Sequence, residues 1–530
     1  MTRPARQRSR GRRTRVITLP QLLSTAVEAD PDAVAVAVAD ATATLAELTY
    51  AELDERSTRL ARLLIARGIG PEDLVAVAAP RSLEAVIALW AVAKCGAGFV
   101  PVNPGDPSAR IAHIVIDGGV SLGLTVAAVR EGLPSAVDWL AVDTGEFAVE
   151  LEGFAADPVT YADRLRPLRA EHPAFVIYTV DTIGAPYGIV ITQAGLSGLC
   201  DAQRTRYRID GDARTLAFAP PSDPVAVLEL LLAVGGTATM IMAAPTVRGG
   251  ADLTALLLRE DVTHAYLGVD VLETVDPAEL DELRVVVCDE QPRPESIARW
   301  TAPISAGPFA SAQRQVLLGY GATETTILTH IGAGTGDDKP EEPAGRVSSV
   351  RTIGTAVHGI TEYVLDRRLS PVADGEVGEL YITGAQVARG YRRRPARTAG
   401  WFVANPFADG SLAGDSRLFR TGDLVRKSGS GNFEYIGSII EGATGESTQV
   451  RSTAAGDADR PPQGDSTADV VKRDSPLLGD AVPKAAPRSV PLPRRARSAA
   501  AAHDAPMTRE GGSGALTQGV PLPSRARSAA

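Results

Sequence analysis

The stretch Phe175–Thr192, FVIYTVDTIGAPYGIVIT, decides how the rest of this chain is interpreted. Two apolar, β-branched runs, Phe175–Tyr178 and Ile189–Ile191, flank a run of small residues that contains Gly184 and Gly188. This pattern predicts a strand, a loop and a second strand. Because clustered backbone N–H groups form a concave site for anions, a loop of this kind can bind phosphate groups. The stretch therefore predicts a phosphate-binding loop between two strands.

Predicted strands alternate with predicted helices on both sides of this stretch. Leu74–Ala79 and Phe99–Val102 have the composition of buried strands, and Ser82–Cys95 between them has helical spacing. Thr215–Ala219 and Ala238–Ala243 continue the strand pattern beyond the loop. Such alternation predicts an α/β fold with a largely parallel sheet and with ligands beyond the strand ends.

The composition changes twice towards the C-terminus. From Arg351 onward, short predicted strands separated by Asp, Gly and Pro turns indicate a small β-rich subdomain. No aromatic residue follows Tyr435, and small, polar and charged residues dominate there. Such a segment cannot bury enough apolar surface to offset its ordering entropy. We therefore expect a basic disordered arm at 1–16, a core at 17–436 and a disordered tail at 437–530.

The composition also limits the classes of partner. The 530 residues are 44% hydrophobic and 22% charged, as in a soluble globular protein. No apolar run approaches the ~20 residues of a membrane span. The net charge of −10 disfavours nucleic acid as the main partner, and three distant cysteines without metal-ligand spacing are expected to be buried free thiols. We thus expect a cytoplasmic protein without a nucleic-acid or membrane partner.

A series of segments in one order identifies the family that the core resembles. They are Leu48–Leu53 (LTYAEL), Trp90–Pro104 (WAVAKCGAGFVPVNP), Thr179–Gly188 (TVDTIGAPYG), Tyr320–Glu324 (YGATE), Gly378–Tyr391 (GELYITGAQVARGY) and Phe419–Leu424 (FRTGDL). From about Ile17 to Ile436, the chain resembles the larger, N-terminal part of the amino-acid adenylation domains of nonribosomal peptide synthetases, which are AMP-forming adenylate synthetases. The resemblance implies α/β subdomains followed by a small β-rich subdomain.

The same resemblance implies a reaction and its participants. The domains of this family activate an amino acid with ATP and Mg²⁺ as aminoacyl-AMP. They then pass the acyl group to the phosphopantetheine thiol of a separate carrier protein. An amino acid or small carboxylic acid is therefore the implied substrate, and a carrier protein or another synthetase module is the implied partner.

Matching this chain to the family motifs implies a set of site residues. The nucleotide-binding candidates are Thr179, Thr182, Gly184, Gly188, Tyr320, Gly321, Thr323 and Asp423. Tyr320 would stack on adenine, Asp423 would accept hydrogen bonds from the ribose hydroxyls, and Glu324 would bind Mg²⁺. Within the substrate-pocket segment Phe218–Glu229, the candidates are Asp223, Val225 and Leu228. The structural alternatives are a core tyrosine, a turn aspartate and a surface glutamate.

Several departures from the family pattern fall at chemical positions. In the phosphate loop, Val180 replaces a serine, Asp181 a glycine, Ile183 a threonine and Tyr187 a lysine. The loss of two hydroxyls weakens phosphate binding by about 1.5–3 kcal/mol for each hydroxyl. The Asp181 carboxylate repels a phosphate group by ~3 kcal/mol. No lysine lies between Lys94 and Lys339 to supply a local ammonium. We therefore expect weak nucleotide binding.

The substrate pocket and the C-terminal part depart as well. Pro224 stands where the family has the aspartate that grips the substrate's amino group, and Asp223 lies one place early. A surface turn aspartate is the alternative interpretation of Asp223. Cys288 and Asp289 replace a glycine pair beside the nucleotide. After Gly437, we expect the hinge aspartate and the small C-terminal subdomain with its catalytic lysine to be missing.

Three functions remain open from the sequence. The first is a degenerate adenylation domain that binds an adenine nucleotide weakly and is impaired or inactive as a ligase. The second is an active AMP-forming amino-acid or acyl ligase that works with a separate C-terminal subdomain. The third is a non-catalytic interaction module that docks on synthetase partners through its basic arm and tail.

Overall fold

The computed structural model describes residues 16–180, 186–304, 313–333, 352–410, 414–428 and 432–439. All of them belong to one compact unit, Met1–Ala458. Residues 1–15 of the predicted arm, residues 440–530 of the predicted tail and residues 181–185 of the phosphate loop lie outside the described residues. Those parts of the domain division therefore stay predictions.

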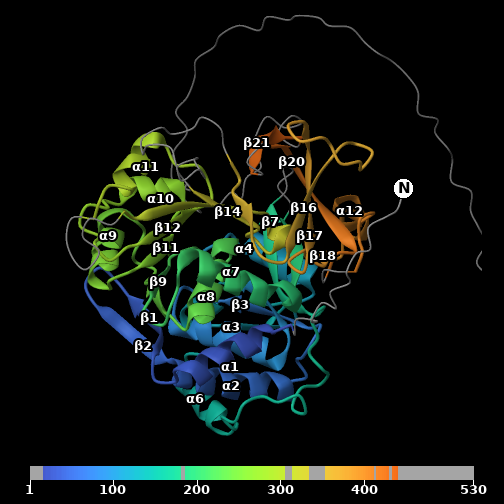
Figure 1. The fold of residues 1–530 in the computed structure, drawn as a ribbon. Coiled ribbons are helices and arrows are strands. Elements are labelled where there is room, and N and C mark those ends of the chain that lie inside the picture. The colour runs from blue at the N-terminus through green and yellow to red at the C-terminus, as the bar shows by residue number, and fades with distance from the viewer. Residues whose placement is uncertain are drawn as a thin grey trace, which may run out of the picture. The chain divides into compact units, whose positions relative to one another are not determined.

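The largest sheet in the described part of the chain has nine strands (Figure 1). Its order is β15 (Thr355–Ala356), β14 (His330–Ala333), β13 (Gln315–Tyr320), β12 (Val285–Cys288), β11 (His264–Tyr266), β9 (Arg214–Ala217), β10 (Thr239–Ala243), β1 (Val34–Ala39) and β2 (Thr44–Thr49). The six strands from β13 to β1 pair in parallel, whereas β14 and β2 pair antiparallel on either side. The predicted α/β alternation with a largely parallel sheet is therefore confirmed.

A second sheet of seven strands contains the stretch that decides the fold. Its order is β18 (Gly390–Tyr391), β8 (Pro186–Thr192), β7 (Pro173–Val180), β4 (Gly98–Val102), β3 (Leu74–Ala78), β5 (Leu122–Thr125) and β6 (Asp138–Ala141). Strands β7 and β8 form an antiparallel hairpin in which Ile177 pairs with Ile189 and Thr179 pairs with Tyr187. The two predicted strands on either side of the loop are thus confirmed.

The third sheet forms the predicted β-rich subdomain. Its strands are β16 (Ile360–Leu365), β17 (Val377–Gly384), β20 (Arg417–Lys427) and β19 (Phe402–Ala404), with β21 (Phe433–Ser438) paired to β20. Strand β20 was not predicted, since the Thr-Gly-Asp in its middle is typical of a turn. Gly422 adopts a positive φ of 77° inside this strand, and the pairing with β21 shifts register between Leu424 and Val425. The turn-like residues therefore form an irregularity within a continuous strand.

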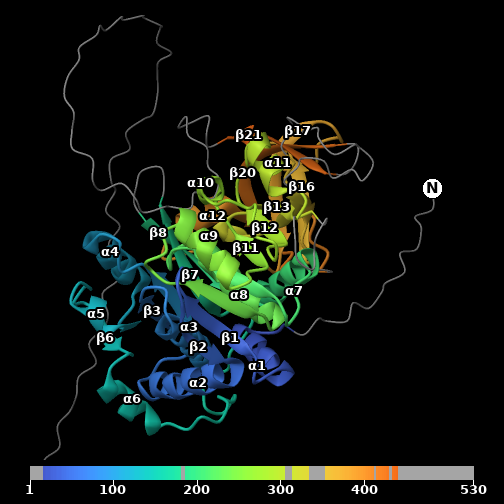
Figure 2. The same cartoon turned by 90° about the vertical axis from the view of Figure 1, so that its left-hand side faces the viewer.

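Helices cover the two large sheets on both faces. The helices that share one core with the inner faces of both sheets are α1 (Leu19–Ala29), α2 (Tyr50–Ala66), α3 (Leu83–Cys95), α7 (Leu196–Tyr207) and α8 (Pro224–Gly236). The outer face of the nine-stranded sheet packs on α9 (Gly250–Arg259), α10 (Val269–Thr274) and α11 (Pro294–Trp300). Helix α4 (Ser108–Gly118) packs on the outer face of the seven-stranded sheet. Figures 1 and 2 both show α1, α2 and α3 side by side.

The remaining described helices are short. They are α5 (Ala127–Arg130), α6 (Gly145–Glu152), α12 (Pro395–Trp401) and the 3₁₀ turns η1 (Gln193–Gly195) and η2 (Thr323–Thr325). Helix α10 has only six residues and ends at Thr274. The proline at 277 explains the early end, because a residue before proline disfavours helical backbone.

Two helix boundaries follow directly from local sequence. Helix α2 begins after Thr49, whose hydroxyl accepts from the backbone N–H of Glu52 while the Glu52 carboxylate accepts from the Thr49 N–H. Helix α3 begins after Ser82 and ends at Gly96, which adopts a left-handed φ of 93°. Helices α2 and α3 pack against each other in the interior.

Two expectations from composition concern membranes and thiols. Within the described ranges, no helix combines the length and the apolar character that a membrane crossing requires. Cys95, Cys200 and Cys288 are buried free thiols, as predicted. Burial raises the pKa of Cys95 and of Cys200 to about 12, so these thiols stay protonated near neutral pH.

Candidate nucleotide site

Two predicted nucleotide ligands meet where β13 ends. Tyr320 is the last residue of β13, and its hydroxyl donates a hydrogen bond to Asp423 Oδ2 at 2.6 Å across 103 residues of sequence. Burial, reinforced by the Asp423 charge, raises the pKa of Tyr320 well above its ordinary value, so the phenol keeps its proton. Asp423 lies within β20, so the alternative of a turn aspartate is wrong. The fold therefore places an aromatic ring and a carboxylate side by side.

The predicted metal ligand lies one turn beyond the end of β13. Glu324 belongs to η2, and its Oε1 accepts a 2.8 Å hydrogen bond from the hydroxyl of Tyr391 in β18. Its backbone carbonyl accepts from the N–H of Ala388 at 2.7 Å. Burial raises the pKa of Glu324. Since this carboxylate is half-buried and held by a second strand, the alternative of a surface glutamate is wrong.

Gly321 and Thr323 shape the turn that presents Glu324. A Cβ atom on Gly321 would lie 2.2 Å from the carbonyl oxygen of Ile327, so the turn excludes any larger residue there. Thr323 is buried, and its carbonyl accepts from the N–H of Thr326. Thr326 and Ile327 adopt positive φ values of 59° and 74°, which are strained for β-branched residues. Backbone strain of this kind is typical of functional turns.

The hairpin β7–β8 holds the described part of the predicted phosphate loop. Thr179 pairs with Tyr187, and Val180 pairs with Pro186 next to the loop. Gly188 lies inside β8, where a Cβ atom would come within 2.8 Å of Val176 Cγ1 and 2.9 Å of Tyr178 Cζ. Gly188 therefore permits close packing against the neighbouring strand. The other loop candidates, Thr182 and Gly184, lie outside the described residues.

The substrate-pocket candidates lie at the start of α8. Asp223 is the N-cap of this helix, and its Oδ1 accepts a 2.8 Å hydrogen bond from the N–H of Val225. With 3% of its surface exposed, Asp223 is not the surface turn aspartate of the alternative interpretation. Leu228, one turn further along α8, is also buried.

Burial raises the pKa of Asp289, after β12, to about 6, with smaller contributions from Glu290 and Asp223. The Asp223 carboxylate at the start of α8 therefore acts electrostatically on the Asp289 carboxyl after β12.

Sequence reasoning missed one cation of this site. The guanidinium carbon of Arg397, in α12, lies 4.0 Å from the ring centroid of Tyr187 and 5.0 Å from that of Tyr391. A signal was present in the sequence, because a tyrosine at the expected lysine position offers an aromatic face on which arginine stacks well. Nothing in the spacing between residues 187 and 397 indicated which arginine would reach it.

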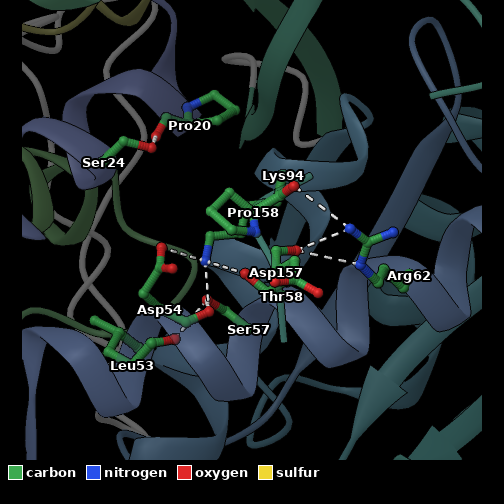
Figure 3. Close-up of polar contacts among 10 residues, drawn as sticks. All are labelled: Pro20, Ser24, Leu53, Asp54, Ser57, Thr58, Arg62, Lys94, Asp157 and Pro158. Carbon is green, nitrogen blue, oxygen red and sulfur yellow. Dashed lines mark hydrogen bonds and ion pairs between the residues drawn. The ribbon is translucent and has the colours of Figure 1, made fainter. Parts of the chain in front are cut away.

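Lys94, the lysine nearest in sequence to the predicted loop on its N-terminal side, is held elsewhere. Its Nζ lies 2.7 Å from Asp54 Oδ1, 2.7 Å from the Asp54 carbonyl oxygen and 2.8 Å from Thr58 Oγ1 (Figure 3). Burial lowers the pKa of Lys94 to about 8. This ion pair joins α2 to α3 in the interior, and its ammonium group is fully engaged there.

The described carboxylates do not form a preassembled metal centre. Among the residues that the structure describes, no three His, Cys, Asp or Glu side chains gather as metal ligands.

Comparisons with known proteins agree with this arrangement. The family of AMP-binding enzymes matches residues 23–392. The chain is 36% identical over 429 residues to CymA of Salinispora arenicola, described as a probable non-canonical nonribosomal peptide synthetase. This alignment covers 80% of this chain and 5% of that protein. The chain is 35% identical over 428 residues to novobiocin biosynthesis protein H of Streptomyces niveus, covering 80% of this chain and 67% of that protein.

A solved structure has the same fold as the described core. The N-terminal subdomain of NpsA from Klebsiella oxytoca superposes with a TM-score of 0.65 at 22% identity, covering 79% of this chain and 100% of that subdomain. Together with the match of the family over most of the core, these similarities settle the assignment. This chain belongs to the family of AMP-binding enzymes, and its described core corresponds to the N-terminal subdomain of nonribosomal peptide synthetase adenylation domains.

Proposed function

We propose that this chain binds an adenine nucleotide beyond the carboxyl end of β13. The adjacency of Tyr320 and Asp423 carries the proposal. The tyrosine ring supplies a face on which adenine can stack. A carboxylate has about four lone-pair sites, so Asp423 can accept from ribose hydroxyls beside, or in place of, the Tyr320 hydroxyl. The family match supports AMP as the part of the ligand that is recognised.

Mg²⁺ with the nucleotide phosphates is proposed to bind beside Glu324. A single carboxylate held at 2.8 Å by the Tyr391 hydroxyl suits an ion that the phosphates bind jointly. Burial favours the protonated form of Glu324, and a nearby cation reverses this preference. Binding of Mg²⁺ would therefore deprotonate this group.

The ancestral reaction is activation of an amino acid or small carboxylic acid. A carboxylate oxygen of the substrate bonds to the α-phosphorus of ATP, and the bond from that phosphorus to the bridging oxygen of pyrophosphate breaks. Acyl-AMP and pyrophosphate result, and the phosphopantetheine thiol of a separate carrier protein is the acyl acceptor. The start of α8, with Asp223, Val225 and Leu228, is the proposed substrate-binding wall.

We propose that this chain is impaired in that reaction. Val180, Asp181 and Ile183 replace the polar or small residues expected in the phosphate loop. Together these changes weaken phosphate binding by ~5 kcal/mol, which corresponds to more than a thousandfold. Pro224 also removes the expected partner for a substrate amino group.

Calorimetric titration with adenosine, AMP and MgATP tests the nucleotide site. We expect weak binding that Asp423→Asn reduces at least tenfold for all three ligands, because each contains the ribose. Asp374→Asn is the matched control, since Asp374 lies in the same subdomain with an exposed side chain. Equal affinities for Asp423→Asn and the unchanged protein would refute the placement of the ribose.

Pyrophosphate exchange separates the impaired ligase from an active one. We expect no amino-acid-dependent exchange of pyrophosphate into ATP above background across the common amino acids. Robust exchange with one amino acid would support the active-ligase alternative. The interaction-module alternative relies on the arm and tail, and a pull-down of synthetase partners with and without these segments tests it.

A further inference from the structure

A cavity of about 60 Å³ is lined by residues of both large sheets. Its wall includes Val77 of β3 and Pro101 of β4 from the seven-stranded sheet, and Ala217 of β9 and Met242 of β10 from the nine-stranded sheet. Each of these residues is the last or second-last of its strand, and both strand pairs are parallel. Ligands of α/β folds bind beyond the carboxyl ends of parallel strands. The cavity therefore lies at a position that suits a ligand.

The first two turns of two helices complete the wall of this cavity. Helix α3 contributes Ala85 and Val86, and helix α8 contributes Ala226 and Glu229. The two residues from α8 differ from the proposed substrate-binding residues of the same helix. The cavity is thus a separate feature from the proposed substrate wall.

The two ionisable residues on the wall are already bound to the backbone. Glu229 accepts from the N–H groups of Phe218 at 3.0 Å and of Ala219 at 3.2 Å. Arg81 donates to four backbone carbonyl oxygens, including that of Phe218 at 2.6 Å. Burial raises the pKa of Glu229 to about 8, so this carboxyl is mostly uncharged near neutral pH. A charged ligand would have to displace these backbone hydrogen bonds to find a partner, which disfavours it.

The rest of the wall consists mainly of apolar side chains. A water molecule needs roughly two to four polar partners, so such a space favours an apolar occupant over water. Since one water-sized group needs roughly 10–15 Å³, the cavity accommodates about four non-hydrogen atoms. A second cavity of about 10 Å³ shares Val86, Leu230 and Met240 with the first. Because a methionine side chain is flexible, Met240 can turn and make room for a slightly larger molecule.

We propose that this cavity is a binding site for a small, uncharged, mainly aliphatic molecule of about four non-hydrogen atoms, such as a short-chain alcohol. Such a molecule gains dispersion contacts with every side of the wall. A carboxyl oxygen has more than one lone pair, so Glu229 can accept one further hydrogen bond from a hydroxyl group. The inference goes beyond the proposed function and does not depend on it, because none of the residues that carry it is a proposed nucleotide ligand.

Methionine methyl groups can report on this site. The chain has four methionines, of which Met240 and Met242 line the cavity. Met1 and Met507 lie outside the described residues and serve as reference signals. The full chain, labelled with ¹³C at the methionine methyl groups, is titrated with 1-propanol and followed by NMR. Propylammonium, which has the same number of non-hydrogen atoms and a positive charge, is the matched probe, and xenon is the fully apolar probe.

1-Propanol is expected to shift the Met240 and Met242 signals saturably at millimolar concentration and to leave both reference signals in place. Xenon should shift the same two signals. Propylammonium should need at least a tenfold higher concentration for the same shift, because it loses its hydration and gains no counter-ion in the cavity. Shifts that do not saturate with 1-propanol, or equal responses to 1-propanol and propylammonium, would overturn the inference.

Two substitutions fill the cavity from different helices. Ala85→Leu extends a side chain from α3 and Ala226→Leu extends one from α8, and each should weaken 1-propanol binding at least tenfold. Ala66→Leu, at an exposed position of α2, adds the same atoms elsewhere and should change the affinity less than twofold. Thermal melting reports whether each variant folds. If only one filling variant folds, that variant decides, and if neither folds, the three probes decide on the unchanged protein.

Affinities for 1-propanol that stay within twofold in the folded filling variants would show that the alcohol binds elsewhere, and would refute the site. Adenosine binding separates this inference from the proposed function. If the unchanged protein binds 1-propanol saturably at Met240 and Met242 but does not bind adenosine, the cavity site stands and the proposed function fails.

Discussion

Charged side chains occupy two contrasting regions of this molecule. In the interior between the large sheets, Lys94 pairs with Asp54, and Glu229 accepts from the backbone N–H groups of Phe218 and Ala219. At the nucleotide edge, Asp423 and Glu324 accept from tyrosine hydroxyls, and Arg397 stacks on tyrosine rings. The ionisable groups of the interior are bound by fixed parts of the fold, such as the backbone N–H groups around Glu229.

The edge differs because its partners can be exchanged. A tyrosine hydroxyl can be replaced by a ribose hydroxyl or by a water molecule, and an aromatic face can share a cation with a phosphate. Arg81 illustrates the opposite case, since it donates to the carbonyl oxygens of Phe218, Ala243, Ala244 and Val247. A cavity of about 60 Å³ beside Arg81 and Glu229 is otherwise lined mainly by apolar side chains. The partners of a charge therefore distinguish structural from ligand-binding roles.

The largest loss of stability from a single substitution is expected at the interior ion pair. Asp54→Ala leaves the buried Lys94 ammonium without its carboxylate and should lower the free energy of unfolding by about 3 kcal/mol. Glu55→Ala is the matched control, because Glu55 forms an exposed pair with Arg59 that is worth about 0.5 kcal/mol. Urea denaturation measures both. A similar small loss in the two variants would remove the contrast between interior and surface charges.

The pH dependence of stability should reveal the second interior carboxyl. Burial raises the pKa of Glu229 from 4.5 to about 8, so between these values the folded protein keeps a proton that the unfolded chain loses. Its contribution to stability is therefore fully present at low pH and declines as pH rises from 4.5 to 8, by at most about 1.4 kcal/mol per unit.

Glu229→Gln removes this titration while its amide oxygen can still accept from Phe218 and Ala219. Other carboxyls with raised pKa, such as Asp289, titrate equally in both proteins and cancel in the difference. Urea denaturation between pH 5 and 8 should show a smaller decline for the variant. Parallel curves would mean that Glu229 is ionised inside the folded protein at all these pH values.

A change in the phosphate loop should have an intermediate effect on binding. Asp181→Gly removes a negative charge and restores backbone freedom, so MgATP should bind about 2 kcal/mol more tightly, against about 1 kcal/mol for Val180→Ser. The gain should be larger for ATP than for adenosine and should fall as salt rises. Calorimetry measures these differences. Equal gains for ATP and adenosine would show that Asp181 does not face the phosphates.

The smallest effect is expected at the exchangeable hydrogen bond of the edge. Tyr320→Phe removes the hydroxyl that donates to Asp423 and should cost about 1 kcal/mol of stability. Adenosine binding should be kept, since the ring still stacks and the carboxylate is released for the ribose. Thermal melting and calorimetry measure the two quantities. A loss of stability as large as that of Asp54→Ala would place Tyr320 among the structural interior groups.

Local sequence predicted the elements whose causes are local. The reciprocal cap of Thr49 and Glu52 and the stop of α3 at Gly96 need only neighbouring residues. The two strands expected from the apolar runs of the hairpin are confirmed. The order of motifs also predicted the family. That Tyr320 donates directly to Asp423 was shown only by the structure. Interactions within a few residues leave a signature that a single sequence shows.

Tertiary structure decided which charged and polar groups meet. Asp223 is buried as a helix cap, β20 continues through Gly422, and Arg397 reaches Tyr187 from α12. Each outcome depends on chain segments that are distant in sequence and on the competition between hydration and burial at the place where they meet. The sequence by itself therefore determined the family and the ends of local elements. Tertiary structure decided which charged side chains lie in the interior and which lie at the nucleotide edge. The physical reason is that the packing of the sheets selects the partners of a buried charge.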